Sequence, residues 1–150
     1  MCSPRLSEFC IRRRVEFSET DTAGMVHFSN FFRYMEACEH EMFRSLGLSV
    51  NLQVGGQEYH LPRVNAECTF RAPLFFEDEF EVKLLVREVR SKVIIHDFVV
   101  SKFDGQQTSC VAIGSVTAVC TQRQPDGALR AVEWPREVAA LFEPARSKAE

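Results

Sequence analysis

Residues 19–31, with the sequence ETDTAGMVHFSNF, decide the fold because the hydrophobic pattern changes its period across them. Before this stretch apolar and charged side chains alternate, which predicts a strand over residues 9–18. Arg13 interrupts the apolar face of that strand and indicates a sheet edge or an open end. From Phe28 onward apolar residues recur every three to four positions, which predicts a helix of about five turns. These residues are Phe28, Phe31, Phe32, Met35, Cys38, Met42 and Leu46.

The rest of the chain is dominated by strand-like segments. We expect Ser29 or Asn30 to cap the start of the helix, and Gly47 to cap its end. Residues 48–57 are predicted to form a loop or a short helical turn. The long β segments are rich in Val, Ile, Phe and Thr. Turns between them are predicted at Ser91 or its neighbours and at Asp104-Gly105. These segments cover residues 58–71, 79–90, 92–103 and 108–122.

One strand, a long helix and four antiparallel strands together predict an α+β protein. A curved five-stranded sheet wrapped around one helix buries both apolar surfaces in the simplest way, and this is the outline of a hotdog fold. We expect a single domain over residues 1–150 with its core over about 9–135. A short closing helix over 135–142 and a frayed tail over 143–150 are expected to complete the chain.

The composition excludes several classes of protein. The formal net charge of −3 argues against a nucleic-acid partner, which usually needs a basic face. No apolar run approaches the ~18 residues of a membrane span, and no signal peptide is evident, so we expect a cytoplasmic protein without a membrane partner. The six cysteines form no Cys-x-x-Cys pair, which favours reduced thiols over disulfides or a metal site. They are Cys2, Cys10, Cys38, Cys68, Cys110 and Cys120.

Asp21 is the first candidate for catalysis because it lies just ahead of the helix start. Free N–H groups at a helix start can polarise a carbonyl group. A carboxylate beside them can attack that carbonyl or direct water at it. The other interpretation is a turn or capping residue, since Asp and Gly are common turn formers and Gly24 follows closely. The pattern alone leaves both interpretations open.

The segment from Asp21 to Val26, followed by Asn30 and Phe31, resembles the signature of the 4-hydroxybenzoyl-CoA thioesterase family. The resemblance covers roughly residues 10–135 and implies a hotdog enzyme that hydrolyses an acyl-CoA thioester to a free acid and coenzyme A. It implies no cofactor apart from the coenzyme A of the substrate, and no metal. It continues through the sequences LPRV, FRAPL and DEFEV at residues 61–64, 70–74 and 78–82.

The resemblance also assigns roles to residues of this segment. Asp21 matches the catalytic acid, either nucleophile or general base, and the backbone N–H of Phe28 is expected to point at the thioester oxygen. Gly24 belongs to the same motif. His27 is expected to line the acyl pocket or to hydrogen-bond a polar acyl group, with a structural role as the alternative. Thioesterases of the related Tol-Pal branch carry a Tyr and a His where this chain has Phe17 and Phe28, so we expect Asp21 to work with backbone donors.

Two further sets of charged residues are candidates for the site. Arg90, Ser91 and Lys92 fall where the family holds the coenzyme A nucleotide, whose phosphates need cations, although a solvated hairpin is the alternative. Arg63 is expected either to face the site or to form a structural ion pair. Because a second hotdog lineage uses a helical Glu, Glu36 or Glu39 is a rival to Asp21. A solvated or subunit-facing helix charge is the favoured interpretation of both.

The resemblance implies a homodimer or homotetramer in which two sheets join. The acyl pocket would then lie between the helix of one subunit and the strands of its partner. Two other functions remain open, which are hydrolysis of acyl groups on an acyl carrier protein and non-catalytic binding of acyl-CoA. Short, long and aromatic acyl groups all fit these residues.

Overall fold

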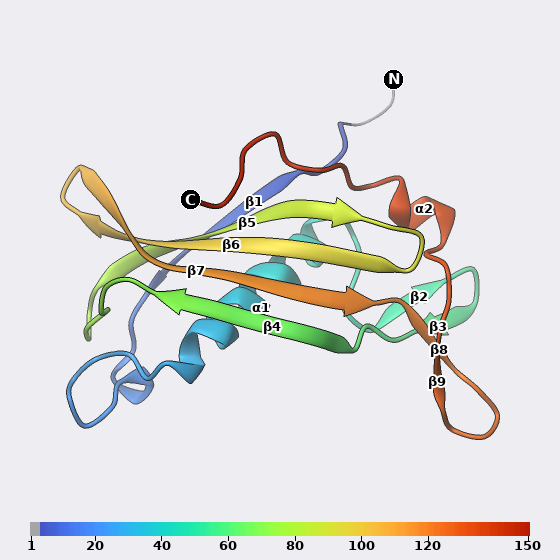
Figure 1. Cartoon of the computed structure of the whole chain (residues 1–150), viewed down its shortest axis with the longest axis horizontal. Coiled ribbons are helices and arrows are strands. Elements are labelled where there is room, and N and C mark those ends of the chain that lie inside the picture. Colours follow the sequence, from blue (N-terminus) through green and yellow to red (C-terminus); the bar gives the residue numbers. More distant parts are fainter. Residues whose placement is uncertain (1–3) are drawn as a thin grey trace.

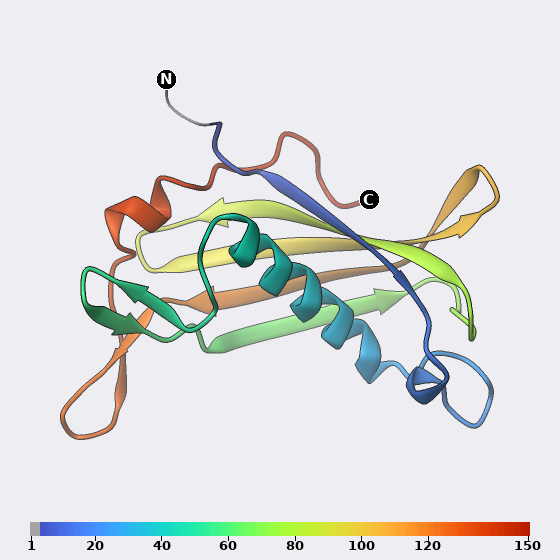
Figure 2. The ribbon, with the colours of Figure 1, turned by 180° about the vertical axis from the view of Figure 1, so that it is seen from behind.

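The computed structural model describes residues 4–150 and contains the sheet-wrapped helix that the sequence predicts (Figure 1). Five antiparallel strands form one sheet in the order β1-β5-β6-β7-β4. The helix α1 (Ser29–Ser45) lies across one face of that sheet, as Figure 2 shows from behind. The strands are β1 (Glu8–Arg14), β4 (Arg63–Phe70), β5 (Glu79–Val89), β6 (Val93–Asp104) and β7 (Gln107–Val119).

The core forms between α1 and the face of the sheet that it covers. Because side chains alternate across a strand, every second residue of the central strands points at the helix. Phe80, Val82 and Leu84 of β5 and Phe98 and Val100 of β6 are all fully buried. On the helix the buried residues follow the predicted spacing, and they are Phe31, Tyr34, Met35, Cys38, Glu39, Met42 and Phe43.

Three of the predicted strands are shorter or interrupted in the structure. The strand over 9–18 ends at Arg14, and a 3₁₀ turn, η1 (Phe17–Glu19), follows it. The strand over 58–71 is divided at Leu61-Pro62, because proline has no N–H to donate to a sheet. Its first part pairs with residues of the predicted loop as the hairpin β2 (Leu52–Val54) and β3 (Gln57–Tyr59). The strand over 108–122 is divided into β7 and β8 (Thr121–Arg123), and β8 pairs with β9 (Leu129–Ala131).

The two ends of α1 differ in how well they were predicted. The prediction that Ser29 or Asn30 caps the helix is wrong, because Phe28 occupies the N-cap position and its side chain makes no capping hydrogen bond. The C-terminal prediction is confirmed. Gly47 has φ +74°, in the left-handed region that glycine adopts without strain, and its N–H donates to the Arg44 carbonyl at 3.0 Å.

The C-terminal residues run back along the sheet from the short helix α2 (Arg136–Ala139) (Figure 1). Where the sequence predicts a frayed tail, the Ala145 N–H donates to the Val86 carbonyl at 2.7 Å. The Ser147 hydroxyl donates to the Glu8 carboxylate at 2.9 Å. This segment therefore contacts β5 and β1.

The sheet ends in β1 on one side and in β4 on the other. The edge position of β1 confirms the prediction from Arg13. No helix of the described residues is long and apolar enough to cross a membrane. The cysteines of residues 4–150 are free thiols, namely Cys10, Cys38, Cys68, Cys110 and Cys120, and Cys2 lies outside the described residues.

Candidate active site

The loop that carries Asp21 is a tight reversal of the chain between η1 and α1. Its two sides meet in a bridge between Thr20 and Val26, and the Asp21 N–H donates to the Met25 carbonyl at 2.7 Å. Inside the loop the Gly24 N–H donates to the Asp21 carbonyl at 3.0 Å. Gly24 has φ +79°, which a residue with a side chain adopts only with strain. Gly24 therefore shapes the loop that presents Asp21.

The two carboxylate oxygens of Asp21 have different surroundings. Oδ1 accepts the Ala23 N–H at 2.8 Å and the Met25 N–H at 3.3 Å, as in a turn stabilised by an Asp side chain. Oδ2 accepts no hydrogen bond from any residue of 4–150, and the side chain is half-buried. One oxygen thus holds the turn and the other is open to a substrate or a water molecule.

Phe28 offers a backbone donor at the start of α1. Its φ of −53° and ψ of −33° are helical. The neighbouring N–H groups of Ser29, Asn30 and Phe31 donate to His27 and Phe28, whereas the Phe28 N–H has no acceptor among the described residues. Phe28 as a whole residue is 61% exposed. This N–H, unpaired within residues 4–150, lies at the positive end of the helix dipole, where a developing negative charge is stabilised.

Glu19 holds the Asp21 loop against the start of the helix. Its carbonyl accepts the His27 N–H at 2.9 Å and the Asn30 side-chain amide at 2.8 Å. Its carboxylate accepts the Tyr34 hydroxyl at 2.8 Å and lies 3.5 Å from Arg13. Burial and the hydrogen bond to Glu19 raise the pKa of Tyr34. Glu19 belongs to no recognisable motif, and its position two residues before Asp21 is the one sequence signal that points to it.

His27 and its neighbours lie on the outside of the loop. The His27 ring is exposed, its Nδ1 lies 2.7 Å from the Ser29 hydroxyl, and its centroid is 4.6 Å from that of Phe28. Ser29 and Asn30 therefore hold the turn rather than cap the helix. Apolar side chains surround the loop and remain exposed, and they are Phe17, Met25, Phe70, Phe75 and Phe76.

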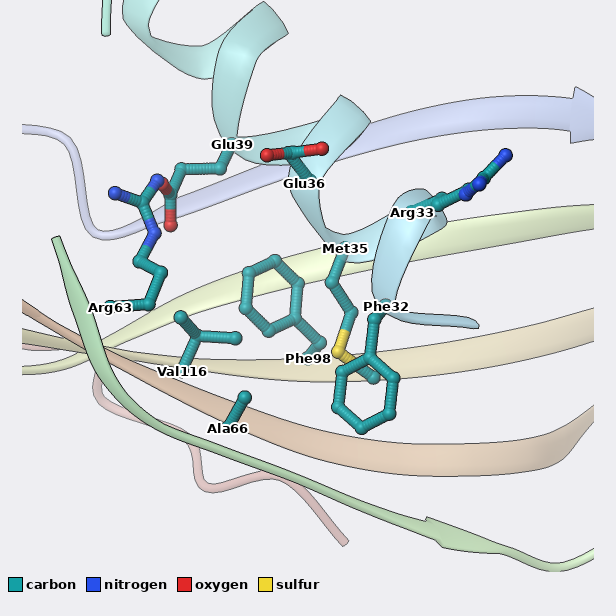
Figure 3. Close-up of a pocket in the computed structure, with 9 residues that line it drawn as sticks. All are labelled: Phe32, Arg33, Met35, Glu36, Glu39, Arg63, Ala66, Phe98 and Val116. Carbon is teal, nitrogen blue, oxygen red and sulfur yellow. The ribbon is translucent and has the colours of Figure 1, made fainter. Parts of the chain in front are cut away.

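A pocket of about 200 Å³ lies beside α1, starting one turn beyond Phe28 (Figure 3). It is formed by the helix on one side and by β4, β6 and β7 on the other. Most of its wall is apolar surface, although four charged side chains also line it, and two of them, Arg63 and Glu39, meet at one end. The lining residues are Phe32, Arg33, Met35, Glu36, Glu39, Arg63, Ala66, Phe98 and Val116.

Glu39, Arg63 and His96 form a buried polar cluster at that end of the pocket. Glu39 is only 3% exposed, and its carboxylate accepts a hydrogen bond from the Arg63 guanidinium and lies 3.0 Å from Nδ1 of His96. His96 is 1% exposed, and burial, with the nearby Arg63 charge, lowers its pKa to about 3. Burial also lowers the pKa of Arg63. The cluster thus consists of one ion pair and a neutral imidazole.

The favoured sequence interpretation of Glu39, a solvated or subunit-facing charge, is wrong. Its spacing on the helix matches a surface charge, but Arg63 of β4 and His96 of β6 close over it. Glu36 is exposed and pairs with His40 at 3.8 Å, as the sequence analysis favoured. Arg63 forms the ion pair that the sequence analysis kept as an alternative. His96 carried no recognisable motif, so its place in the cluster was not predicted.

The hairpin of Arg90, Ser91 and Lys92 joins β5 and β6 at the other end of the sheet from Asp21 (Figure 1). The Asp21 loop lies at the start of β5, and the hairpin follows its last residue. Eleven residues of β5 separate them, roughly 35 Å at about 3.3 Å per strand residue. Within one chain the structure therefore does not bring the hairpin and Asp21 together.

Comparison with known proteins places the chain in a family. A family model described as "Thioesterase-like superfamily" matches residues 15–142. The chain belongs to the thioesterase-like superfamily. The hotdog fold that the sequence predicts is confirmed by a crystal structure of 4-hydroxybenzoyl-CoA thioesterase complexed with 4-hydroxybenzoyl-CoA. The two share 22% sequence identity with a TM-score of 0.79, over 92% of this chain and 100% of that one.

Sequence relatives agree with this family. One relative is a protein of Aquifex aeolicus (strain VF5) that is named as an esterase. It is 41% identical to this chain over 97 residues, which are 64% of this chain and 74% of the relative. A 1,4-dihydroxy-2-naphthoyl-CoA hydrolase of Prochlorococcus marinus (strain NATL2A) is 26% identical over 115 residues, 72% of this chain and 74% of the relative. The prediction of a thioester-hydrolysing enzyme is therefore confirmed at the level of the family.

Proposed function

We propose that this member of the thioesterase-like superfamily hydrolyses acyl-CoA thioesters to a free acid and coenzyme A. The proposal is supported by two groups that have no hydrogen-bond partner within residues 4–150, namely one Asp21 oxygen and the Phe28 N–H at the start of α1. A thioester has a good leaving group, so a carboxylate is strong enough to begin the reaction.

Asp21 acts as nucleophile or as general base. As a nucleophile, its Oδ2 attacks the thioester carbon, the coenzyme A thiolate leaves, and water then hydrolyses the acyl-enzyme anhydride. As a base, it takes a proton from a water that attacks the same carbon. Both routes place negative charge on the carbonyl oxygen, where the Phe28 N–H donates a hydrogen bond.

The acyl group occupies the pocket beside α1, which α1 forms with strands of its own chain rather than with those of a partner. Phe32 begins that pocket four residues after Phe28, which is about 6 Å along the helix axis at about 1.5 Å per residue. An acyl group whose carbonyl lies at the Phe28 N–H can therefore extend along the helix between Phe32, Met35 and Phe98. Relatives such as the dihydroxynaphthoyl-CoA hydrolase act on aromatic acyl groups, which suit these walls.

The coenzyme A nucleotide is held by Arg90, Ser91 and Lys92 of a second subunit. β4 leaves one edge of the sheet open, and its residues are mostly exposed. If two copies pair along this edge as antiparallel strands, the start of one β4 lies beside the end of the other. The hairpin of one subunit then lies at the same end as the Asp21 loop of its partner.

Replacement of Asp21 by Asn tests the proposal. Asn keeps a side-chain oxygen that accepts the Ala23 and Met25 N–H groups, so the loop should persist while the charge is lost. We expect thiol release from acyl-CoA to fall by about 10²–10⁴-fold, the usual contribution of a positioned base. Retained turnover would overturn the assignment of Asp21.

Asp126 provides a matched control. Its Oδ1 accepts the Ala128 N–H at 3.0 Å, two residues ahead, in the same kind of turn. Asp126→Asn should leave thiol release unchanged. A wild-type protein that binds acyl-CoA without releasing thiol would instead be a non-catalytic binder, and release only from acyl carrier protein would identify that substrate class.

A further inference from the structure

The hairpin of residues 90–92 is held from behind by later parts of the chain. The Trp134 N–H donates to the Ser91 carbonyl at 2.9 Å, and the Cys120 N–H donates to the Lys92 carbonyl at 2.8 Å. All three hairpin residues nevertheless remain exposed. Segments that only connect strands are usually mobile, whereas this hairpin presents its side chains from a backbone that is fixed at two points.

Trp134 anchors the segment that holds the hairpin. It is only 8% exposed, and a buried aromatic ring contributes a large apolar area to a core. Just before it the Val132 N–H donates to the Cys120 carbonyl at 2.8 Å, and just after it begins α2, whose Val138 is buried. The helix α2 lies beside the hairpin in both views of the ribbon (Figure 1 and Figure 2). The chain is therefore fixed on both sides of the N–H that Trp134 donates to Ser91.

The cations of the hairpin are available to a ligand. Arg90 pairs with Glu88 at 2.7 Å, but both side chains are exposed, and an ion pair between exposed side chains contributes little stability. A phosphate group can replace such a partner and form stronger charge-assisted hydrogen bonds with the guanidinium. Cations on a fixed backbone lose less conformational freedom on binding than cations on a mobile loop. Anchoring of the hairpin should therefore increase its affinity for phosphates.

We propose that Trp134 is a positioning residue for the coenzyme A nucleotide. It fixes the backbone of Ser91, so that Arg90, Ser91 and Lys92 are presented together to the phosphates. Trp134 acts through the hairpin rather than by contact with the substrate. The proposal rests on the function proposed above, in which this hairpin holds the nucleotide, and adds a residue on which that binding depends.

The test compares butyryl-CoA with butyryl-N-acetylcysteamine, which carries the same thioester without a nucleotide. The ratio of the two kcat/KM values measures the nucleotide preference. We expect a preference of about 100-fold or more in the wild type, since each charge-assisted hydrogen bond to a phosphate contributes about 10-fold or more. Trp134→Leu should lower the preference by about 10-fold through a higher KM for butyryl-CoA at unchanged kcat. Hydrolysis of butyryl-N-acetylcysteamine should stay within about threefold of wild type.

Two control variants separate positioning from general loss of packing. Trp134→Phe keeps an aromatic ring and removes only the indole N–H, which is buried without an acceptor among the described residues. It should keep the preference within about threefold of wild type. Phe142→Leu removes a ring of the same C-terminal segment that is 4% exposed and lies 6.3 Å from the ring of Phe43. It should destabilise the protein to urea and leave the nucleotide preference unchanged.

Fluorescence provides a measurement that requires no replacement in the core. Trp134 is the only tryptophan of the chain, so its emission reports directly on the segment behind the hairpin. Addition of coenzyme A to the wild type should change this emission until the protein is saturated. Arg90→Glu combined with Lys92→Glu should abolish the change, because these charges repel phosphate.

The outcomes separate this inference from the proposed function. A folded Trp134→Leu variant that keeps the nucleotide preference overturns the role of Trp134, as does an equal loss of preference in Phe142→Leu. If Trp134→Leu does not fold, an emission that does not respond to coenzyme A overturns it. A wild-type preference near one does the same while thiol release continues. Absence of thiol release from both thioesters overturns the proposed function itself.

Discussion

At Phe28 the backbone, rather than the side chain, is the group that we expect to act on the substrate. Phe28→Pro removes this N–H, and φ of −53° is close to the value that proline requires. No hydrogen bond within residues 4–150 is lost, because the N–H has no acceptor there. We expect kcat to fall by about 10²–10³-fold, as for the loss of one oxyanion donor.

Phe28→Ala separates the two roles of this residue. It removes the exposed ring but retains the N–H, so kcat should stay close to wild type while KM changes with the lost apolar contact. Circular dichroism would verify that both variants keep the helix. Equal kcat values for Phe28→Pro and wild type would exclude the Phe28 N–H as the oxyanion donor.

His96 should make the fold sensitive to acid. Its folded pKa of about 3 lies below the ordinary value of 6.5, so between these values only the unfolded chain binds the proton. The free energy of unfolding should therefore decrease as the pH falls from about 6.5 to about 3. His96→Asn keeps a donor for Glu39 but does not titrate, and urea melts across this range should show a flatter dependence on pH.

The expected size of this effect is a few kcal/mol, since each unit of pKa difference corresponds to about 1.4 kcal/mol. His40→Asn, at a partly exposed position of α1, is the control. It should leave most of the pH dependence of the free energy of unfolding unchanged. Parallel pH profiles for wild type and His96→Asn would contradict the burial of a neutral imidazole.

At the scale of the secondary-structure elements, α1 packs closely on β7 only because Gly114 of β7 has no side chain. A Cβ placed there would lie 2.1 Å from the end of Met35 and 3.1 Å from the Glu67 carbonyl. Met35 is fully buried and lines the proposed acyl pocket, so it has to rotate into the pocket or push the helix away.

Gly114→Ala should therefore destabilise the fold by about 1–3 kcal/mol, the usual cost of overfilling a packed core. Chemical denaturation provides the measurement, and hydrolysis of aromatic thioesters should weaken more than that of butyryl-CoA. Combining Gly114→Ala with Met35→Ala, which restores space, should recover part of the activity on aromatic thioesters. No loss of stability in Gly114→Ala would show that helix and strand do not pack this closely.

The helix and strands were predictable because each follows a repeat of apolar residues along a short stretch of sequence. The polar cluster of Glu39, Arg63 and His96 instead depends on the register in which distant strands pair. The apolar spacing of α1 and the turn at Gly105 are signals within a few residues of each other. In contrast, Glu39 lies 24 positions from Arg63 and 57 from His96. Their meeting depends on how β4 and β6 pair with β7, which no short pattern encodes. For the same reason Glu39 resembles a surface charge in the sequence.

At the scale of the whole molecule, β5 runs from the Asp21 loop to the Arg90–Lys92 hairpin. The two halves of the proposed site therefore lie at opposite ends of this strand. Glu79 at its start pairs with Arg14, close to the Asp21 loop, while Val89 at its end leads into the hairpin. Arg63 lies at the hairpin end of β4, because Arg63 and Ile94 both pair with Ala118. A two-fold axis through the open β4 edge would exchange these ends between subunits.

Mixing two inactive variants tests whether the hairpin serves the partner's Asp21. One carries Asp21→Asn, and the other carries Arg90→Glu with Lys92→Glu, which should weaken coenzyme A binding through charge repulsion. After the subunits are exchanged, a mixed dimer combines an intact Asp21 with an intact hairpin from the other chain at one of its two sites. We expect recovery of about a quarter of wild-type activity at equal mixing, because half of the random dimers are mixed. If each hairpin instead serves the Asp21 of its own chain, every site in the mixture contains a replacement and activity stays at the level of the unmixed variants.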